Sequence, residues 1–282
     1  MAGKLYLCAT PIGNLEDITY RVLRTLGEVD LIAAEDTRNS RKLLNHFDIK
    51  TPLTSYHEYN KIEKGKYLIR KMQEGMTVAL ITDAGTPGIS DPGEELVAMC
   101  YEEQIPVTSL PGPAACVTAL TISGLPTRRF CFEAFLPSDK KERRRILEEL
   151  KEETRTIVIY EAPHRLAKTL GELEEALGDR QMSLVRELTK KHETVHRSSV
   201  SRLKSQVQEE PVRGECVLVI AGKSLEEIQA QDIARWEDMP LAEHMALYEK
   251  QGLNRKEAMR QVAKDRGVPK REIYRQLLET TE

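Results

Sequence analysis

Short apolar runs alternate with amphipathic stretches as far as residue 221, and this alternation constrains the fold most strongly. In residues 142–152, for example, Ile146, Leu147 and Leu150 recur at helical spacing while charges fill the other face. Strands separated by helices predict an α/β protein with largely parallel sheets. The predicted strands are residues 4–9, 31–34, 77–81, 107–110, 129–135, 156–160, 182–186 and 215–221, and the predicted helices are residues 20–28, 40–47, 61–73, 94–103, 142–152 and 164–177.

Two changes of pattern predict the domain boundaries. A run rich in proline and glycine at residues 110–115 separates two α/β halves, and after Gly222 the alternation gives way to helices only. A chain of 282 residues is long enough for more than one core. We therefore expect α/β domains at 1–112 and 113–224 and a helical module at 225–282.

Composition excludes several classes of protein. No apolar run approaches the roughly 20 residues that span a bilayer, and the apolar stretch near the start is too short for a signal peptide. We expect a cytoplasmic protein with no membrane partner. The five cysteines are scattered, odd in number and never spaced as CxxC, which predicts reduced, mostly buried thiols and no metal site.

Three loops rich in glycine and proline each follow a predicted strand, at residues 9–17, 83–93 and 109–115. Glycine permits positive φ or close approach of the backbone to a ligand, and proline stiffens a turn. Open α/β sheets bind ligands at the carboxyl ends of their strands, so the loops predict a small-molecule site. The alternative is three tight strand-to-helix turns. No GxGxxG follows a strand, which leaves a dinucleotide site without support.

These loops resemble, in order, the motifs of the tetrapyrrole methylases. The resemblance implies two α/β domains with S-adenosylmethionine in the cleft between them. Within that superfamily the chain is most similar to the ribosomal RNA small subunit methyltransferase I branch, over about residues 5–222. The matching strings are LYLCATPIGNLEDIT, AAEDTRNSRKLL, ITDAGTPGISDPG, SLPGPAACVTAL, YEAPHR and RELTKKHE.

One departure from the wider superfamily points away from a porphyrinoid substrate. The porphyrinoid enzymes have GxGPGD in the first loop, whereas this chain has ATPIGN, with Asn14 at the acidic position. The resemblance implies 2′-O-methylation of a cytidine ribose in small-subunit (16S) ribosomal RNA by a homodimer, on free RNA or on the assembled 30S subunit. The alternatives are a non-catalytic protein that binds RNA or ribosomes, and a methylase of a porphyrinoid or of a modified protein side chain.

The resemblance also assigns cofactor contacts to the three loops and to the ends of later strands. Many of these contacts would use backbone atoms. The expected residues are Pro11, Asp83, Ala84, Gly85, Ile89, Ser90, Ala114, Ala115, Tyr160, Glu161, Leu188, Gly214 and Glu215.

Methyl transfer to a ribose hydroxyl needs alignment, together with a base or a cation that stabilises the developing alkoxide. Lys190 is our candidate for that base or cation, with a solvated loop charge as the alternative. Glu35 and Arg38 are candidates for positioning the substrate. The alternative for Glu35 and Asp36 is a pair of carboxylates at a helix N-terminus, where the helix dipole favours acids.

Candidate RNA contacts lie in two places. Arg165 opens a predicted helix after a strand, where it could contact phosphate or cap the helix. In the C-terminal module, Asn254 and Glu257 have the spacing of a capping box, and Gly267 followed by Pro269 predicts a helix-turn-helix.

The last part of the C-terminal module concentrates positive charge. From Gln251 onward there are eight basic and five acidic residues, a net charge of +3 in a chain whose total is −3. This charge predicts docking on RNA phosphates, and a solvated helical cap or a dimer-supporting module is the alternative. The candidate contacts are Arg255, Lys256, Arg260, Lys264, Lys270, Arg271 and Arg275.

Overall fold

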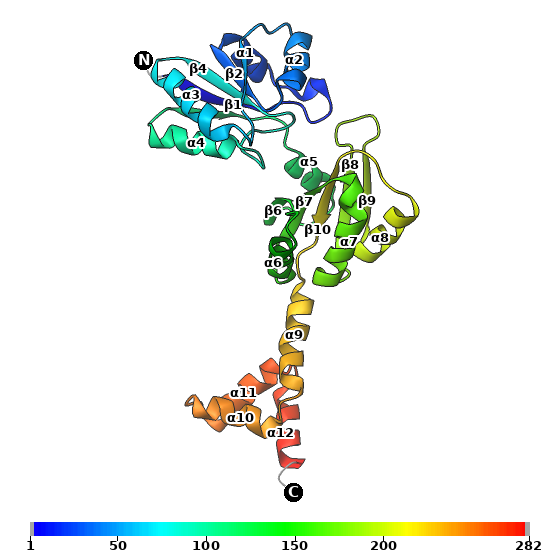
Figure 1. The fold of residues 1–282 in the computed structure, drawn as a ribbon. Coiled ribbons are helices and arrows are strands. Elements are labelled where there is room, and N and C mark those ends of the chain that lie inside the picture. Colours follow the sequence, from blue (N-terminus) through cyan, green and yellow to red (C-terminus); the bar gives the residue numbers. More distant parts are fainter. Residues whose placement is uncertain (1–2, 280–282) are drawn as a thin grey trace. The chain divides into compact units, whose positions relative to one another are not determined.

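The computed structural model describes residues 3–279 and divides the chain into two compact units (Figure 1). Unit 1 is Met1–Ala221 and contains both predicted α/β halves. Unit 2 is Gly222–Glu282 and is helical, so the division falls three residues before the predicted start of the helical module at 225.

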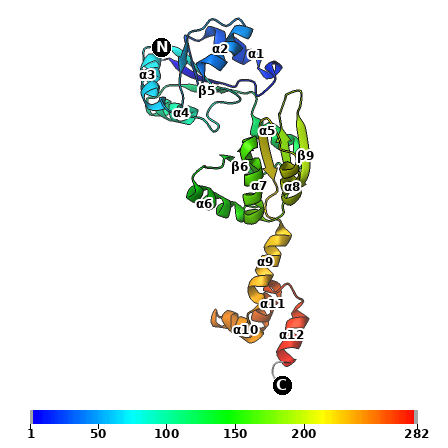
Figure 2. The same ribbon diagram turned by 45° about the vertical axis from the view of Figure 1, so that its right-hand side comes forward.

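Sheet 1 of unit 1 is wholly parallel, as predicted, with strand order β3-β2-β4-β1-β5. Helices α3 and α4 pack on one face and α1 and α2 on the other (Figures 1 and 2). Because both faces are covered, β2 is buried at every position and reads as a continuous apolar run. The elements are β1 (Lys4–Cys8), the short 3-10 helix η1 (Leu15–Asp17), α1 (Tyr20–Glu28), β2 (Leu31–Ala34), α2 (Thr37–His46), β3 (Leu53–Ser55), α3 (Lys61–Gln73), β4 (Thr77–Ile81), α4 (Gly93–Glu102) and β5 (Val107–Leu110).

Sheet 2 is mixed, with strand order β6-β7-β10-β8-β9, and here the prediction of a largely parallel sheet was wrong. Only β6 and β7 are parallel, and the other three pairs are antiparallel. The turn at residues 187–193 is too short for the crossover that parallel neighbours need, so β9 returns beside β8. The elements are α5 (Ala115–Ile122), β6 (Phe130–Phe135), α6 (Lys140–Lys151), β7 (Thr156–Glu161), α7 (Pro163–Leu177), β8 (Gln181–Arg186), β9 (Thr194–Ser199), α8 (Val200–Glu209) and β10 (Cys216–Ile220).

The two faces of sheet 2 have different cores. Helices α6, α7 and α8 bury a cluster on one face that includes Leu147, Leu170 and Leu203. On the other face α5 packs over the valines of β7, β8 and β10, together with Ile12 from the first loop. The first loop therefore belongs to the core beneath α5, although β1 lies in sheet 1.

Unit 2 consists of α9 (Leu225–Glu237), α10 (Leu241–Lys250), α11 (Arg255–Asp265) and α12 (Lys270–Glu279). The predicted capping box is confirmed, because Asn254 accepts from the amide of Glu257 while the Glu257 carboxylate accepts from the Asn254 amide. Gly267 has φ +63°, a left-handed conformation suited to glycine, directly after α11.

Cysteine chemistry and membrane insertion find no support in the described part of the chain. The five cysteines are free and at least partly buried, and burial raises the pKa of Cys131 and Cys216 to about 11. Within residues 3–279, no cluster of three or more potential metal ligands occurs, and no helix is both long and apolar enough to cross a bilayer.

Candidate cofactor cavity and active site

A cavity of about 320 Å³ lies in unit 1. All three glycine- and proline-rich loops, which follow strands of sheet 1, line it together with strands of sheet 2. The lining residues are Ile12, Ala84, Gly85, Thr86, Ile89, Ala114, Ala115, Phe135, Tyr160, Glu161, Ala162, Pro163, Val185, Leu188, Glu215, Cys216 and Val217.

The second loop is held in a fixed shape by its own backbone and by Asp91. Gly85 has φ +87° and exchanges two backbone hydrogen bonds with Thr10, of 2.9 and 3.0 Å. The Asp91 carboxylate accepts from the amides of Gly88 and Gly93, at 2.9 and 2.8 Å. The loop is therefore organised before any ligand arrives, which lowers the entropy cost of binding.

The third loop is fixed to its neighbours by two side chains. Thr86 donates its hydroxyl hydrogen to the carbonyl of Pro113 at 2.9 Å, which connects the second loop to the third. The Cys116 amide donates to the Tyr160 hydroxyl at 2.9 Å, and Phe135 packs edge-on against the Tyr160 ring. These contacts place an aromatic wall beside the start of α5.

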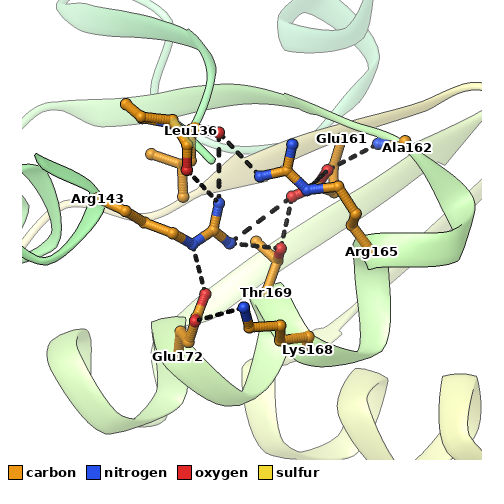
Figure 3. A network of polar contacts seen from close by, with 9 residues as sticks. Leu136, Arg143, Glu161, Ala162, Arg165, Lys168, Thr169 and Glu172 are labelled. Carbon is orange, nitrogen blue, oxygen red and sulfur yellow. Dashed lines mark hydrogen bonds and ion pairs between the residues drawn. The ribbon is translucent and has the colours of Figure 1, made fainter. Parts of the chain in front are cut away.

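The carboxylate of Glu161 is buried at the wall of the cavity and is surrounded by donors (Figure 3). Its oxygens accept from the Ala162 amide at 2.8 Å and from the Thr169 hydroxyl at 2.5 Å. The guanidinium groups of Arg143 and Arg165 lie 3.9 and 3.6 Å away. The Glu161 carboxylate is therefore fully supplied with polar partners without a ligand.

The turn between β8 and β9 holds Lys190 at the edge of the cavity. Its Nζ lies 3.0 Å from the carboxylate of Glu187 and 3.0 Å from that of Glu215, which lines the cavity. Glu187 and Thr189 adopt positive φ values of 50° and 64°, a conformation that costs about 1–3 kcal/mol in a residue other than glycine. Such strain persists only where the surroundings impose it.

The environment of Lys190 favours its charged form. Burial opposes the charge of the ammonium group, but hydrogen bonds to Glu187 and Glu215 outweigh burial and raise the pKa of Lys190. Two carboxylates at 3.0 Å suit a cation better than a base. The role of Lys190 as a base or a cation stays a prediction.

Close packing joins the first loop to this turn. A Cβ at Gly13 would lie 2.6 Å from Cγ of Lys190 and 2.8 Å from the Leu188 carbonyl oxygen. Only a residue without a side chain fits there, so Gly13 allows the first loop and Lys190 to meet.

Glu35 and Asp36, the two acidic residues after β2, lie in different environments. Asp36 is the N-cap of α2, and hydrogen bonds from Arg38 lower the pKa of Asp36 to about 2. Burial, followed by the nearby Asp83 carboxylate, raises the pKa of Glu35. Arg38 is exposed and pairs with Asp36 at 2.8 Å. The helix-terminus alternative thus describes Asp36, while Glu35 lies beside the second loop.

The cavity brings together nine of the residues assigned to the cofactor and leaves four outside its lining. The four outside are Pro11, Asp83, Ser90 and Gly214, each directly next to a lining residue. The nine that line it are Ala84, Gly85, Ile89, Ala114, Ala115, Tyr160, Glu161, Leu188 and Glu215.

The sequence analysis missed the apolar wall of the cavity. Val185 and Val217 are cross-strand partners on β8 and β10, and Phe135 ends β6. These positions read as ordinary strand residues. The pairing of β8 with β10 places the two valines side by side, and this pairing cannot be predicted from the local sequence.

The predicted RNA contacts differ in their exposure and in whether their side chains bind other residues of the chain. The Arg165 guanidinium donates to the carbonyl of Leu136 at 2.9 Å and faces Glu161, so Arg165 contributes to the internal network. In unit 2, Arg275 pairs with Glu272 and Lys270 is half-buried. Arg260 and Lys264 line a shallow groove on α11. The remaining candidates, which are Arg255, Lys256 and Arg271, are exposed.

The chain is similar to known proteins over most of its length. The family of tetrapyrrole (corrin/porphyrin) methylases matches residues 4–204. Proteins named ribosomal RNA small subunit methyltransferase I are 51% identical in Halalkalibacterium halodurans (96% of this chain and 93% of that protein) and 46% identical in Bacillus subtilis (96% and 93%). The protein of that name from Thermotoga maritima is 48% identical over 221 residues, which cover 78% of this chain and 99% of that protein.

Solved structures show the same fold at low sequence identity. A uroporphyrin-III C-methyltransferase of Thermus thermophilus in complex with S-adenyl homocysteine has a TM-score of 0.56 and 20% identity, covering 78% of this chain and 97% of that chain. A diphthine synthase has a TM-score of 0.59 and 16% identity, covering 79% and 91%. At these identities the likeness concerns the fold alone.

Proposed function

The chain belongs to the ribosomal RNA small subunit methyltransferase I family of tetrapyrrole methylases, and we propose that it transfers a methyl group from S-adenosylmethionine to the 2′-hydroxyl of a cytidine in small-subunit ribosomal RNA. The cavity carries this proposal, because nine residues that the family resemblance assigns to the cofactor meet there. The same resemblance gives the ribose of a cytidine as the acceptor.

The residues of the cavity suit S-adenosylmethionine. Its volume of about 320 Å³ lies within the range of small-molecule sites. Val185, Leu188 and Val217 offer an apolar wall, and the backbone of Gly85 approaches without a side chain in the way. The carboxylates of Glu161 and Glu215 place negative charge near a cationic ligand. When bound, the cofactor supplies the methyl group and its leaving group.

Lys190 acts on the acceptor side of the reaction. Its ammonium group, fixed by Glu187 and Glu215 at the edge of the cavity, stabilises the negative charge that develops on the ribose oxygen as the hydroxyl proton passes to solvent water. Glu35, whose pKa is raised by burial, lies beside the second loop and orients the nucleotide together with Arg38. In-line alignment and this charge stabilisation supply most of the rate enhancement.

Two other functions fit parts of the molecule less well. A protein that only binds RNA has no need of an apolar cavity lined by three rigid loops. A porphyrinoid methylase shares the fold, but its first loop would carry GxGPGD, where this chain has Asn14 at the acidic position. The net charge of +3 from Gln251 onward favours RNA over a porphyrinoid or a protein side chain. The predicted homodimer and cytoplasmic location stay predictions, and sedimentation of the full chain tests the first of them.

The proposal is tested with tritiated S-adenosylmethionine and small ribosomal subunits from a strain that lacks this activity. We expect label in the ribosomal RNA only when the protein is present. Free ribosomal RNA in parallel reactions shows which form is the substrate. Absence of label in RNA, together with absence of cofactor binding by calorimetry, contradicts the enzyme function.

A further inference from the structure

A second depression lies between α6 and α7, apart from the cofactor cavity. It encloses about 590 Å³. We call it the α6–α7 groove. Four exposed cations line it, which are Lys140, Arg144, Lys151 and Lys168. Only Leu147 and Ala176 among its lining residues are apolar, so the groove does not suit a hydrophobic ligand.

The charges of the groove are unevenly neutralised. The Glu172 carboxylate forms ion pairs with the guanidinium of Arg143 at 2.6 Å and with Nζ of Lys168 at 3.6 Å. Glu148 lies 3.5 Å from Lys151. Lys140 and Arg144 are both exposed. In the described part of the chain, neither side chain makes an ion pair or a hydrogen bond with another residue.

The position of Lys140 is also unfavourable for a cation because of the helix dipole. Lys140 is the first residue of α6, where the dipole favours acids and disfavours cations by about 0.3–1 kcal/mol. Because no other side chain of the described residues pairs with it, the Lys140 ammonium group is available to an external anion.

A polar network joins the α6–α7 groove to the cofactor cavity, and Figure 3 shows its residues. Arg143 is buried and lines the groove, and its guanidinium lies 3.9 Å from the Glu161 carboxylate. Glu161 in turn lines the cavity. One ion pair therefore connects a residue of the groove to a residue of the cavity.

The Thermotoga relative gives an independent reason to seek an RNA surface on unit 1. Its match covers 221 residues and 99% of its length, so it has no room for counterparts of both unit 1 and unit 2. If that relative acts on RNA as its name states, a unit like unit 1 must bind RNA by itself.

We infer that the α6–α7 groove binds the phosphate backbone of the substrate RNA beside the target nucleotide, through Lys140 and Arg144. This inference rests on the proposed function. RNA fits better than a free anion because the cations are spread along a helix, at positions 140, 144 and 151, rather than gathered at one point. A flexible strand with a charge at every nucleotide matches such a row.

The test compares two double variants of the same helix. Lys140→Ala/Arg144→Ala removes two cations that line the groove. Lys141→Ala/Arg145→Ala removes two exposed cations of α6 that do not line it. Both lose the same charge, and the Arg145–Glu149 pair that the control breaks is exposed and contributes little to stability.

Binding of 16S ribosomal RNA and of small subunits is measured over a salt series, with cofactor affinity by calorimetry. We expect the groove variant to bind RNA at least tenfold more weakly, with KM for RNA raised and kcat retained. Its slope of log K against log salt should fall by about 1.4, or about 0.7 for each phosphate of a single strand that the variant no longer neutralises. The control should change by less than twofold, and neither variant should change cofactor affinity.

Equal RNA affinity and salt slope in the two variants would overturn the groove assignment while leaving the proposed function intact. A wild-type protein that binds cofactor but transfers no methyl group to RNA contradicts the proposed function itself. The two failures are therefore distinguishable.

Discussion

Two carboxylates hold the ammonium group of Lys190 beside the cavity, and although burial opposes its charge, hydrogen bonds to them raise its pKa. The sequence made Lys190 a candidate because it lies in a motif of the family. It could not show the pairing with Glu215, which is 25 residues away in the chain. The internal use of Arg165 escaped prediction for a similar reason, because its hydrogen-bond partner Leu136 is 29 residues away in the chain.

Replacement of Lys190 tests its role in catalysis. Lys190→Ala should lower kcat about a hundredfold or more, since one lost donor to a developing oxyanion costs that much in other enzymes. Cofactor affinity should change by less than about threefold, because Lys190 does not line the cavity. Lys191→Ala, which removes an exposed neighbouring charge, is the matched control and should retain full activity. Unchanged kcat in Lys190→Ala would remove Lys190 from the mechanism.

The pH dependence of the rate separates a cation from a base. The pKa of Lys190 is raised above the ordinary lysine value of 10.5, so its charge is present at all lower pH values and is lost only above that range. We expect kcat, measured from pH 6.5 to 9.5, to show no lysine ionisation that Lys190→Ala abolishes. A rise in kcat towards alkaline pH that disappears in Lys190→Ala would instead identify the neutral amine as a base.

At the scale of elements, the three loops could be predicted because glycine and proline mark them and each follows an apolar strand. The topology of sheet 2 could not be predicted in this way. β9 is an edge strand with mostly polar, exposed residues, and α5 is too uniformly apolar to show an amphipathic period. Without β9 and α5, a parallel arrangement was the simplest interpretation of the remaining strands.

Contact between the first loop and the β8–β9 turn is tested at Gly13. The added Cβ of Gly13→Ala would meet Lys190 and Leu188, so the turn must shift. We expect a 10- to 100-fold loss of kcat, since small misplacements of catalytic groups cost about that much, with a destabilisation of about 1–3 kcal/mol. Gly27→Ala in α1 meets no atom within 4 Å and should be neutral or slightly stabilising. Equal activity of the two variants would show that the turn tolerates displacement.

The whole molecule combines a cofactor-binding unit with a helical unit in which the residues from Gln251 onward carry a net charge of +3. Because the two units are separately compact, a chain ending at Ala221 should fold and bind S-adenosylmethionine with wild-type affinity. Its affinity for ribosomal RNA should fall at least tenfold, with a smaller salt slope, because the cations of unit 2 are removed. Circular dichroism, calorimetry and filter binding measure these outcomes. Unchanged RNA affinity would show that unit 2 serves another purpose, such as support of a dimer.

The most direct test of the central claim is mass spectrometry of nucleosides from under-methylated small subunits, treated with the protein and S-adenosylmethionine. The proposed function predicts a gain of one 2′-O-methylcytidine per subunit, absent without the protein and strongly reduced with Lys190→Ala. Methyl groups on a base or on a ribosomal protein, or no methylated nucleoside at all, would contradict it.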